Sequence, residues 1–401
     1  MDLSKTQKNI HDCIIDGIKS QKSLTTLGGY AGTGKTFLIS QVRKTLEKEN
    51  PKTKMAFTAF TGKASSVLRQ KLGGIDESKH STGTIHSLIY RPRFRWNPKM
   101  NDRVVVGWDR VEDIDRDLII IDEASMVSEE IFNDLNSFGV NILAVGDHGQ
   151  LPPIQESNFS LMKNPEYKLE EIFRQAYNNP IIALSEIARK SGSIPFGVFK
   201  PEVAKIKRTD EKSKEWFNKV GWTEDSIVLC GLNKTRVEYN SIIRKNLGFK
   251  DDILYPGERL ICLRNNRRSG IFNGQLGMLM MILHESPDIL EACIQMDGEK
   301  ELYNGLIYER VFGKESYDNI FNLPKDKYKK IQEAIKNTNF SYLDYFDWGY
   351  CITVHKSQGS EWKRVVLLEE RAWNWPDSLY AKWLYTGITR ASERLIIMSY
   401  D

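Results

Sequence analysis

The sequence predicts an α/β protein that contains two parallel sheets, and three observations support this prediction. In the first third of the chain, short β-branched runs alternate with helix-like segments, which is typical of a parallel sheet with crossover helices. A second series of such runs begins at residue 227 and resumes near the C-terminus. The chain has 401 residues, more than one compact core usually holds, so we expect more than one domain.

The first sheet is expected to follow an amphipathic helix over residues 5–20, where isoleucines recur at helical spacing. A further helix is expected from Lys35. Each strand is predicted from a short apolar run, because such runs suit strands that are buried on both faces. The predicted strands are residues 24–27, 55–59, 118–121 and 141–145.

Residues 89–108 interrupt this alternation. They place Phe94 and Trp96 among arginines, and a run of three valines follows. We interpret the segment as a β-hairpin with an aromatic, basic tip. A plain surface loop that packs its own aromatic side chains is the alternative.

The second sheet is predicted from the runs at 227–230, 364–368 and 394–398. The stretch between the first two runs differs in character, because residues 257–263 and 273–279 resemble antiparallel strands of a small barrel and 325–336 resembles a charged helix. We therefore expect an inserted domain. The predicted domains are 1–165, 166–250 together with 345–401, and the insert 251–344.

Charge and cysteine content narrow the class of protein. The formal net charge is only +4, so any contacts with a polyanion are expected in one channel rather than over the whole surface. The five cysteines contain no C-x-x-C pair, which argues against a zinc ribbon and favours reduced thiols. Without a signal-like N-terminus or an apolar run of about 20 residues, we expect a cytoplasmic protein.

The strongest motif is the eight-residue segment that begins at Gly29 and ends at Thr36, which fits G-x-x-x-x-G-K-[ST] between a strand and a helix. Gly29, Gly32 and Gly34 allow backbone N–H groups to turn toward phosphate oxygens. Lys35 should reach the β- and γ-phosphates of ATP, and the Thr36 hydroxyl should ligate Mg²⁺.

The segment from Gly29 to Thr36 is called the P-loop. Polar residues follow two further predicted strands at the same edge of the sheet as the P-loop. Asp122 and Glu123 end the strand at 118–121, so Asp122 would hold Mg²⁺ and Glu123 would orient and deprotonate the attacking water. An acidic helix cap is the alternative. Gln150 follows the strand at 141–145 and could contact the γ-phosphate or the water, although a polar turn is a serious competitor.

A P-loop alone does not separate a small-molecule kinase from a motor. Phosphoryl transfer gains from an arginine that meets the charge developing on the γ-phosphate, and Arg174 and Arg390 are the candidates. If both contact ATP, hydrolysis is linked to closure of a cleft between two domains. For either arginine taken alone, a surface salt bridge is the ordinary alternative.

Taken together, these segments resemble the superfamily 1 helicases, in the RecD-like and Dda-like branch of bacteria and phages. The resemblance runs nearly from end to end and rests on ordered motifs. Its one clear departure is Phe60, which stands where the family usually has proline, and we expect Phe60 to pack inward. The matching segments are 6–7, 29–36, 58–64, 81–86, 122–126, 146–153, 173–175, 353–361 and 385–391.

The resemblance implies two RecA-like P-loop motor domains. The hairpin at 89–108 would be a pin that splits the duplex, and the insert at 251–344 would be an SH3-like β-barrel, which implies 5′→3′ translocation. The protein would use ATP and Mg²⁺ and act on single-stranded DNA and on junctions of single- and double-stranded DNA. It would act as a monomer in the cytoplasm of a bacterium or a phage-infected host, with replication or recombination proteins as possible partners. A nucleic-acid-stimulated ATPase switch or recombination factor without unwinding is the alternative function.

The resemblance also assigns roles to individual residues. Gln7 would read the adenine edge, while Gly359 and Glu361 would approach the γ-phosphate and the ribose. Aromatic rings and histidines in such a channel stack bases without sequence preference, although for His86 and His355 a structural hydrogen bond is the alternative. The residues expected to contact the nucleic acid are Thr61, Thr84, His86, Phe94, Trp96, Thr353, His355 and Lys356.

Overall fold

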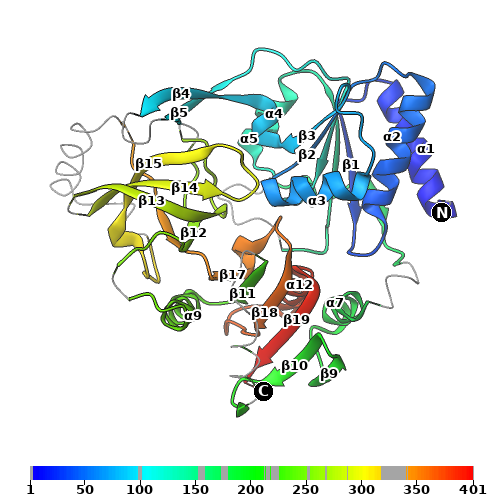
Figure 1. Cartoon of the computed structure of the whole chain (residues 1–401). Coiled ribbons are helices and arrows are strands. Elements are labelled where there is room, and N and C mark those ends of the chain that lie inside the picture. Colours follow the sequence, from blue (N-terminus) through cyan, green and yellow to red (C-terminus); the bar gives the residue numbers. More distant parts are fainter. Residues whose placement is uncertain are drawn as a thin grey trace.

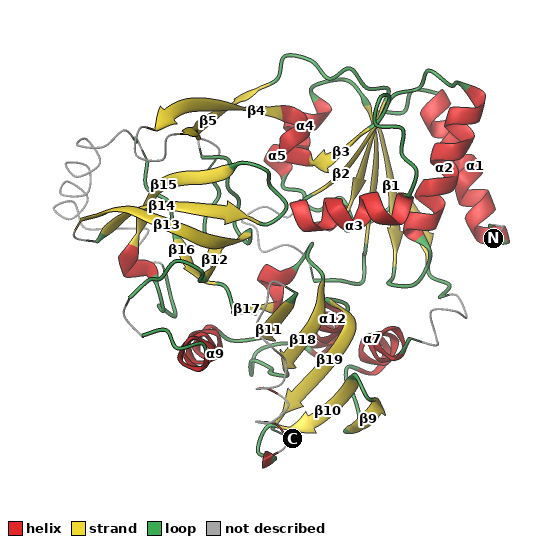
Figure 2. Ribbon diagram, viewed as in Figure 1, coloured by secondary structure: helices red, strands yellow, loops and turns green. Residues whose placement is uncertain are grey.

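The computed structural model contains two six-stranded sheets, one five-stranded sheet and one two-stranded ribbon (Figure 1). Figure 2 shows helices flanking both six-stranded sheets, whereas the five-stranded sheet forms a separate body of strands. The residues that the structure describes are 3–97, 102–151, 159–172, 179–211, 213, 217, 225–250, 253–266, 269–286, 288–317, 340 and 342–400.

The first sheet is parallel throughout and has the strand order β3-β2-β6-β7-β1-β8. Helices α1 (Lys5–Lys19) and α2 (Lys35–Glu49) share one hydrophobic core with it. The four strands and two helices predicted here are confirmed. The strands are β1 (Leu24–Gly29), β2 (Met55–Ala59), β3 (Ser81–Thr84), β6 (Leu118–Asp122), β7 (Asn141–Gly146) and β8 (Tyr167–Leu169).

Strand β8 corrects the first predicted domain boundary. It pairs with β1 through Leu27 and Tyr167, so the first sheet extends past residue 165. Short helices complete this body: α3 (Gly62–Leu72), α4 (Ile85–Ile89), η1 (Ala124–Met126) and α5 (Glu129–Asn136).

The segment predicted as a hairpin forms an antiparallel ribbon of β4 (Tyr90–Asn97) and β5 (Asp102–Arg110). Two aromatic side chains of β4 project into solvent, since Phe94 is 43% and Trp96 55% exposed. In Figure 1 the ribbon reaches from the first sheet toward the five-stranded sheet. Its aromatic side chains are therefore accessible.

The second sheet has the order β17-β11-β18-β19-β10-β9 and is parallel except for the edge strand β9. Alternate residues along its strands enter different cores, as expected for a sheet covered on both faces: α7 and α12 pack on one face and α9 on the other. The elements are α7 (Pro180–Ser191), β9 (Gly197–Lys200), β10 (Val203–Lys207), β11 (Ser226–Cys230), α9 (Asn233–Asn246), β17 (Cys351–Thr353), η3 (Val354–Ser357), β18 (Trp362–Leu368), α12 (Asp377–Ile388) and β19 (Ala391–Ser399).

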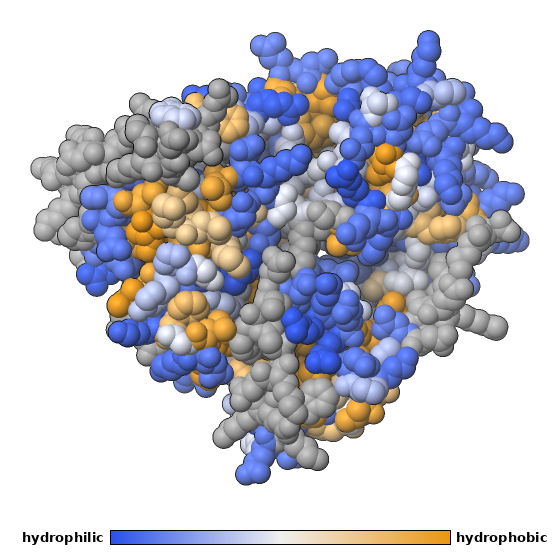
Figure 3. Space-filling view, in the orientation of Figure 1, coloured by the Kyte–Doolittle hydropathy of each residue, from blue (hydrophilic) through white to orange (hydrophobic). Residues whose placement is uncertain are grey.

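The five-stranded sheet, called the insert below, is antiparallel with the order β15-β14-β13-β12-β16. Strand β16 extends it past the predicted boundary at 344, and the helix predicted at 325–336 lies outside the described residues. Figure 3 shows apolar surface gathered over the insert, where β13 exposes Met280 and Met281. The elements are β12 (Arg259–Cys262), β13 (Leu276–Ser286), β14 (Ile289–Met296), β15 (Leu302–Tyr308), η2 (Glu309–Val311) and β16 (Phe346–Trp348).

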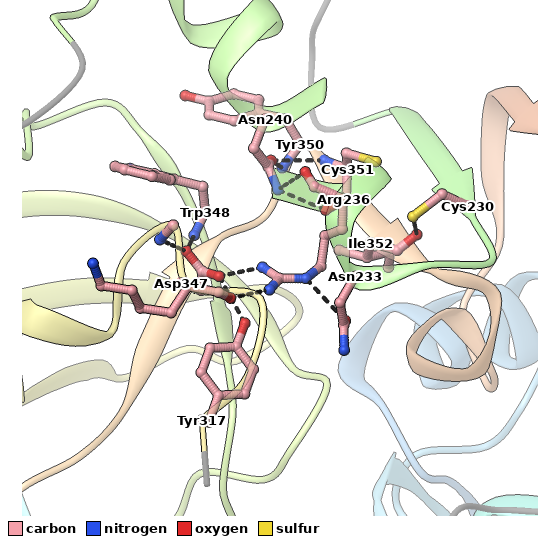
Figure 4. Close-up of polar contacts among 12 residues, drawn as sticks. Cys230, Asn233, Arg236, Asn240, Tyr317, Asp347, Trp348, Tyr350, Cys351 and Ile352 are labelled. Atoms are coloured by element: carbon pink, nitrogen blue, oxygen red, sulfur yellow. Dashed lines mark hydrogen bonds and ion pairs between the residues drawn. The ribbon is translucent and has the colours of Figure 1, made fainter. Parts of the chain in front are cut away.

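Helix α9 fastens the insert to the second sheet through residues spaced four apart on one of its faces. Arg244 forms a buried ion pair with Glu258, with Nε 2.5 Å from Oε1, and Arg236 forms another with Asp347 (Figure 4). Between them, the Asn240 amide group donates to the Cys351 carbonyl over 2.8 Å. Since both ion pairs are buried, breaking either would leave a charge in the interior.

Within the described parts of the chain, no helix has the length and apolar character needed to cross a membrane.

Candidate functional site

The P-loop has the conformation that its glycines allow. Gly32 and Gly34 both adopt φ of 78°, a left-handed conformation in which a side chain would be strained. The loop leads from β1 into the first turn of α2, which begins at Lys35. Lys35 Nζ donates to the carbonyl oxygens of Gly29 at 2.7 Å and Tyr30 at 3.0 Å, so the cation lies within the loop that would hold phosphates.

Asp122 and Glu123 lie at the carboxyl end of β6, as predicted. Glu123 has φ of 54°, a left-handed conformation that is uncommon for a non-glycine residue and recurs at functional sites. Burial raises the pKa of both carboxyl groups; Lys35 opposes this shift at Asp122, and Arg390 opposes it most strongly at Glu123. Glu123 Oε2 is buried and has no hydrogen-bond partner among the described residues, as suits an acceptor reserved for water.

A cavity of about 490 Å³ joins these groups to the second sheet. Its walls come from the P-loop, from the carboxyl ends of β6 and β7, from α7, and from the turn that precedes β19. The two halves of the predicted nucleotide site therefore face one space. The predicted residues that line it are Gly32, Gly34, Lys35, Thr36, Asp122, Glu123, Gln150, Glu361 and Arg390.

Arg390 is held in this cavity by hydrogen bonds to neighbouring residues of the C-terminal half. The residue is 3% exposed. Its guanidinium donates to the carbonyl oxygens of Thr386 at 3.2 Å and Ser360 at 3.0 Å, and to the Thr389 hydroxyl at 3.3 Å. Three of its five N–H groups are thus occupied, and the other two, which have no partner among the residues that the structure describes, can meet an anion.

Four residues predicted to belong to the nucleotide site are not among the described residues that line the cavity. Gln7 is buried behind the P-loop, where its Nε2 donates to the Thr33 carbonyl at 3.3 Å and its Oε1 accepts from Ser4 N–H at 3.2 Å. Both ends of its amide group therefore bond to the protein, and this arrangement does not support the predicted contact with adenine. Gly29 contributes its carbonyl to Lys35. Gly359 accepts from the Thr61 hydroxyl at 3.1 Å. Arg174 lies outside the described residues.

The sequence reasoning missed several residues of the cavity. Tyr30 occupies a variable position of the P-loop motif, and its ring lies 3.9 Å beneath the Arg189 guanidinium. Lys71 lies in the last turn of α3, with its Nζ 4.0 Å from Glu361 Oε2. Neither has a sequence signal of its own. Tyr385 is not itself a lining residue, but it contacts one, since its hydroxyl accepts from the Ala31 N–H at 2.8 Å. It does have a sequence signal, because it precedes Arg390 by five residues in the same motif.

A second cavity, of about 250 Å³, lies where the three sheets meet. Phe60 and Met126 line it from the first sheet, Asn273 from the insert, and His355 and Lys356 from the second sheet. Burial lowers the pKa of Lys356 to about 8 and also lowers that of His355. Phe60 packs partly inward, with its ring centroid 6.2 Å from that of Phe272, and also borders this cavity.

The three predicted channel threonines act as helix N-caps. The hydroxyl of Thr61 accepts from Ala64 N–H at 3.2 Å, and that of Thr353 accepts from Lys356 N–H at 3.4 Å. Thr84 caps α4 in the same manner. Each hydroxyl satisfies a backbone donor at a helix start. The structure therefore assigns them a local structural role, and contact with a nucleic acid stays a prediction.

The arrangement around His86 argues against its predicted role in base stacking. The side chain is buried, and its ring centroid lies 4.5 Å from those of Tyr90 and Trp108 and 4.7 Å from that of Phe272. Trp108 belongs to the ribbon and Phe272 to the insert. His86 therefore packs in an aromatic junction, and a base has no access to its ring in this arrangement.

Comparison with known proteins gives a family for the chain. Residues 2–198 match the family described as an AAA domain, and 349–398 match the UvrD-like helicase C-terminal domain. The ATP-dependent DNA helicase Pif1 of Campylobacter jejuni is 25% identical over 85% of this chain and 81% of its own length. The ATP-dependent RecD2 DNA helicase of Deinococcus radiodurans is 24% identical over 95% of this chain and 47% of its own length.

A third relative, the ATP-dependent DNA helicase dda of Enterobacteria phage T4, is 26% identical over 65% of this chain and 61% of its own length. The chain thus spans most of the Pif1 relative but only about half of the RecD2 relative. The matched regions contain the P-loop, the paired carboxylates and Arg390, which the cavity brings together. The chain therefore belongs to the superfamily 1 helicases of the Pif1, RecD and Dda type.

Proposed function

We propose that this protein hydrolyses ATP between its two parallel sheets and uses the resulting movement to travel along single-stranded DNA, 5′→3′, and to separate duplex DNA. The observation that carries the proposal is the cavity that the P-loop shares with Arg390. A kinase of small molecules does not need an arginine from a second sheet, whereas a motor gains a link between hydrolysis and cleft closure. The ATP-dependent DNA helicases among its relatives support the same reading.

The cavity residues divide the chemistry among themselves. Lys35 and the P-loop N–H groups bind the phosphates, and Arg390 stabilises the charge that develops on the γ-phosphate. Glu123 accepts a proton from the attacking water, and Gln150 positions that water. Gln150 Oε1 is buried without a hydrogen-bond partner among the described residues, which suits this role.

The residues present also fit Mg²⁺. Thr36 and Asp122 line one cavity, and a hydroxyl with a carboxylate beside phosphate oxygens is the donor set that this ion prefers. Mg²⁺ would neutralise the phosphate charge when bound. Asp122 is positioned for it by the Glu123 N–H, which donates to Oδ1 at 3.1 Å.

We place the single strand in the second cavity, where all three sheets contribute. A phosphate backbone there would meet Lys356, and bases would meet Phe60 and His355. The exposed aromatic side chains Phe94 and Trp96 support a separating role for the ribbon. The SH3-like character of the insert and the 5′→3′ direction follow from the family resemblance.

We further propose that the chain works as a monomer in the cytoplasm. Its motor domains would be the first sheet, with residues up to about 169, and the second sheet, with the insert at about 251–348 between its strands. These limits follow the predicted domains with the two boundaries moved to include β8 and β16.

The test is an unwinding assay with 5′-tailed and 3′-tailed duplexes of DNA and RNA, alongside ATPase measurements with and without single-stranded DNA. We expect stimulated hydrolysis and unwinding of the 5′-tailed DNA duplex. Lys35→Ala should abolish hydrolysis while single-strand binding survives. Stimulated hydrolysis without unwinding of any duplex would favour the ATPase switch, and hydrolysis that does not respond to single-stranded DNA would refute the motor.

A further inference from the structure

The P-loop is connected to the C-terminal half by one buried phenol. Tyr385 on α12 is 1% exposed. Its oxygen accepts the Ala31 N–H at 2.8 Å, and its O–H donates to Asp147 Oδ2 at 2.5 Å. Ala31 belongs to the P-loop and Asp147 to the turn after β7, so a side chain from the second sheet bridges two loops of the first.

The same Asp147 carboxylate organises the turn that bears Gln150. Its Oδ1 accepts the Gly149 N–H at 2.8 Å, and its Oδ2 accepts from Gln150 Nε2 at 3.4 Å. The Leu151 N–H then donates to the Thr386 hydroxyl of α12 at 2.9 Å. The amide of Gln150 is therefore oriented through a carboxylate that Tyr385 also contacts.

Protonation of the phenol is essential to this arrangement, and the site secures it. Burial, followed by the charge of Asp147, holds the pKa of Tyr385 well above its usual range. The neutral hydroxyl can accept one hydrogen bond and donate another, whereas a phenylalanine ring can do neither. Opening the cleft would separate Tyr385 from both partners at once, because the partners lie in the other half.

We propose that Tyr385 is a positioning residue for ATP hydrolysis, which reports cleft closure to the P-loop and to Gln150. This inference rests on the proposed function of the cavity. In the closed cleft the phenol fixes the Ala31 peptide and the Asp147 carboxylate, so Gln150 is oriented only when the C-terminal half, with Arg390, is in place. Hydrolysis is thereby coupled to closure beyond the contribution of Arg390 itself.

The variant Tyr385→Phe removes both hydrogen bonds and keeps the ring. Tyr380→Phe is the matched control, since Tyr380 lies on the same helix and its O–H donates to the Glu369 carboxylate at 2.8 Å, outside the cavity. Both variants lose a phenol–carboxylate bond, but only the first loses a contact with the nucleotide site. Thermal unfolding of both variants measures their stability.

We expect Tyr385→Phe to lower kcat of DNA-stimulated hydrolysis at least tenfold, equivalent to about 1.4 kcal/mol, with less than about a threefold change in the KM for ATP. Tyr380→Phe should keep kcat within about twofold. Unchanged kcat in Tyr385→Phe, or an equal loss in both variants, would overturn the proposal. If wild-type hydrolysis does not respond to DNA, the proposed function fails instead.

A second variant covers the case in which Tyr385→Phe does not fold. Asp147→Asn preserves the side-chain shape but removes the charge that accepts the phenol proton. We expect the same fall in kcat with little change in KM. A kcat equal to wild type in Asp147→Asn would likewise overturn the proposal.

Discussion

Replacing Arg390 by alanine tests whether the second sheet takes part in the chemistry. An arginine that contacts the γ-phosphate contributes roughly 10³ to 10⁵ to kcat. Three of the five N–H groups of Arg390 already bond to Thr386, Ser360 and Thr389, so about two remain for phosphate. We therefore expect the lower end of the range, a loss of about 10³ in kcat, or about 4 kcal/mol of transition-state stabilisation.

A pH profile gives Arg390→Ala a second signature. Burial raises the pKa of Glu123, and the positive charge of Arg390 is the largest effect opposing that rise. Removing the charge lets the pKa rise further, so the acid limb of the kcat profile should move to higher pH, because Glu123 accepts a proton only when ionised. Arg390→Lys keeps the charge, so it should lower kcat while moving the limb less.

The assay is DNA-stimulated phosphate release under saturating ATP across pH. Arg371→Ala is the control, because Arg371 is a partly exposed arginine near the start of α12 that pairs with Asp377 at 2.6 Å and lies outside the cavity. It should keep kcat within about twofold. A kcat for Arg390→Ala within about tenfold of wild type would refute the assignment of Arg390 to the transition state.

Three further predictions concern the nucleic acid and the insert. Trp96→Ala should lower unwinding at least about fivefold, from the loss of stacking, while DNA-stimulated hydrolysis changes less; equal losses in the two assays would contradict a separating role. Because the pKa of Lys356 is lowered to about 8, single-strand affinity should fall as pH rises through that value, and Lys356→Arg should bind equally across it. A wild-type Kd that stays constant from about pH 7 to 9 would exclude Lys356 from phosphate binding. Arg236→Ala leaves the buried Asp347 carboxylate without its cation, although that carboxylate still accepts from Tyr317 and two backbone N–H groups. Denaturant unfolding should therefore show that the free energy of unfolding falls by about 3 kcal/mol. An equal fall in Arg310→Ala, which breaks the exposed ion pair with Asp288, would contradict this.

The nucleotide half of the site could be predicted because its chemistry is local in sequence. A strand, a glycine loop and a helix follow one another directly around Lys35. Asp122 and Glu123 come at the end of the buried run at 118–121. In a parallel sheet, the carboxyl ends of neighbouring strands lie at one edge. Sequence order and strand ends were therefore sufficient to bring Lys35, Asp122 and Gln150 together.

Residues whose environment depends on packing between sheets could not be predicted in this way. His86 lies beside threonines in sequence, but Trp108 from the ribbon and Phe272 from the insert close over its ring. Gln7 forms a capping box with Ser4, and its side chain donates to the Thr33 carbonyl of the P-loop. Tyr385 acts through Asp147 across more than 200 residues of sequence. Periodicity and motif spacing contain no information on such contacts.

The charges of the nucleotide cavity argue that ATP enters together with its metal ion. Among the described residues, three cations and four carboxylates line the cavity, so a triphosphate with a charge of about −4 would meet an excess of negative groups without a further cation. Burial already raises the pKa of Asp122 and Glu123, because it disfavours their charged forms, and an anionic ligand beside them would raise it further. The oxygen donors of Thr36 and Asp122 suit Mg²⁺, so chelating the metal should weaken ATP binding as well as stop hydrolysis. The charged residues are Lys35, Lys71, Arg390, Asp122, Glu123, Asp147 and Glu361.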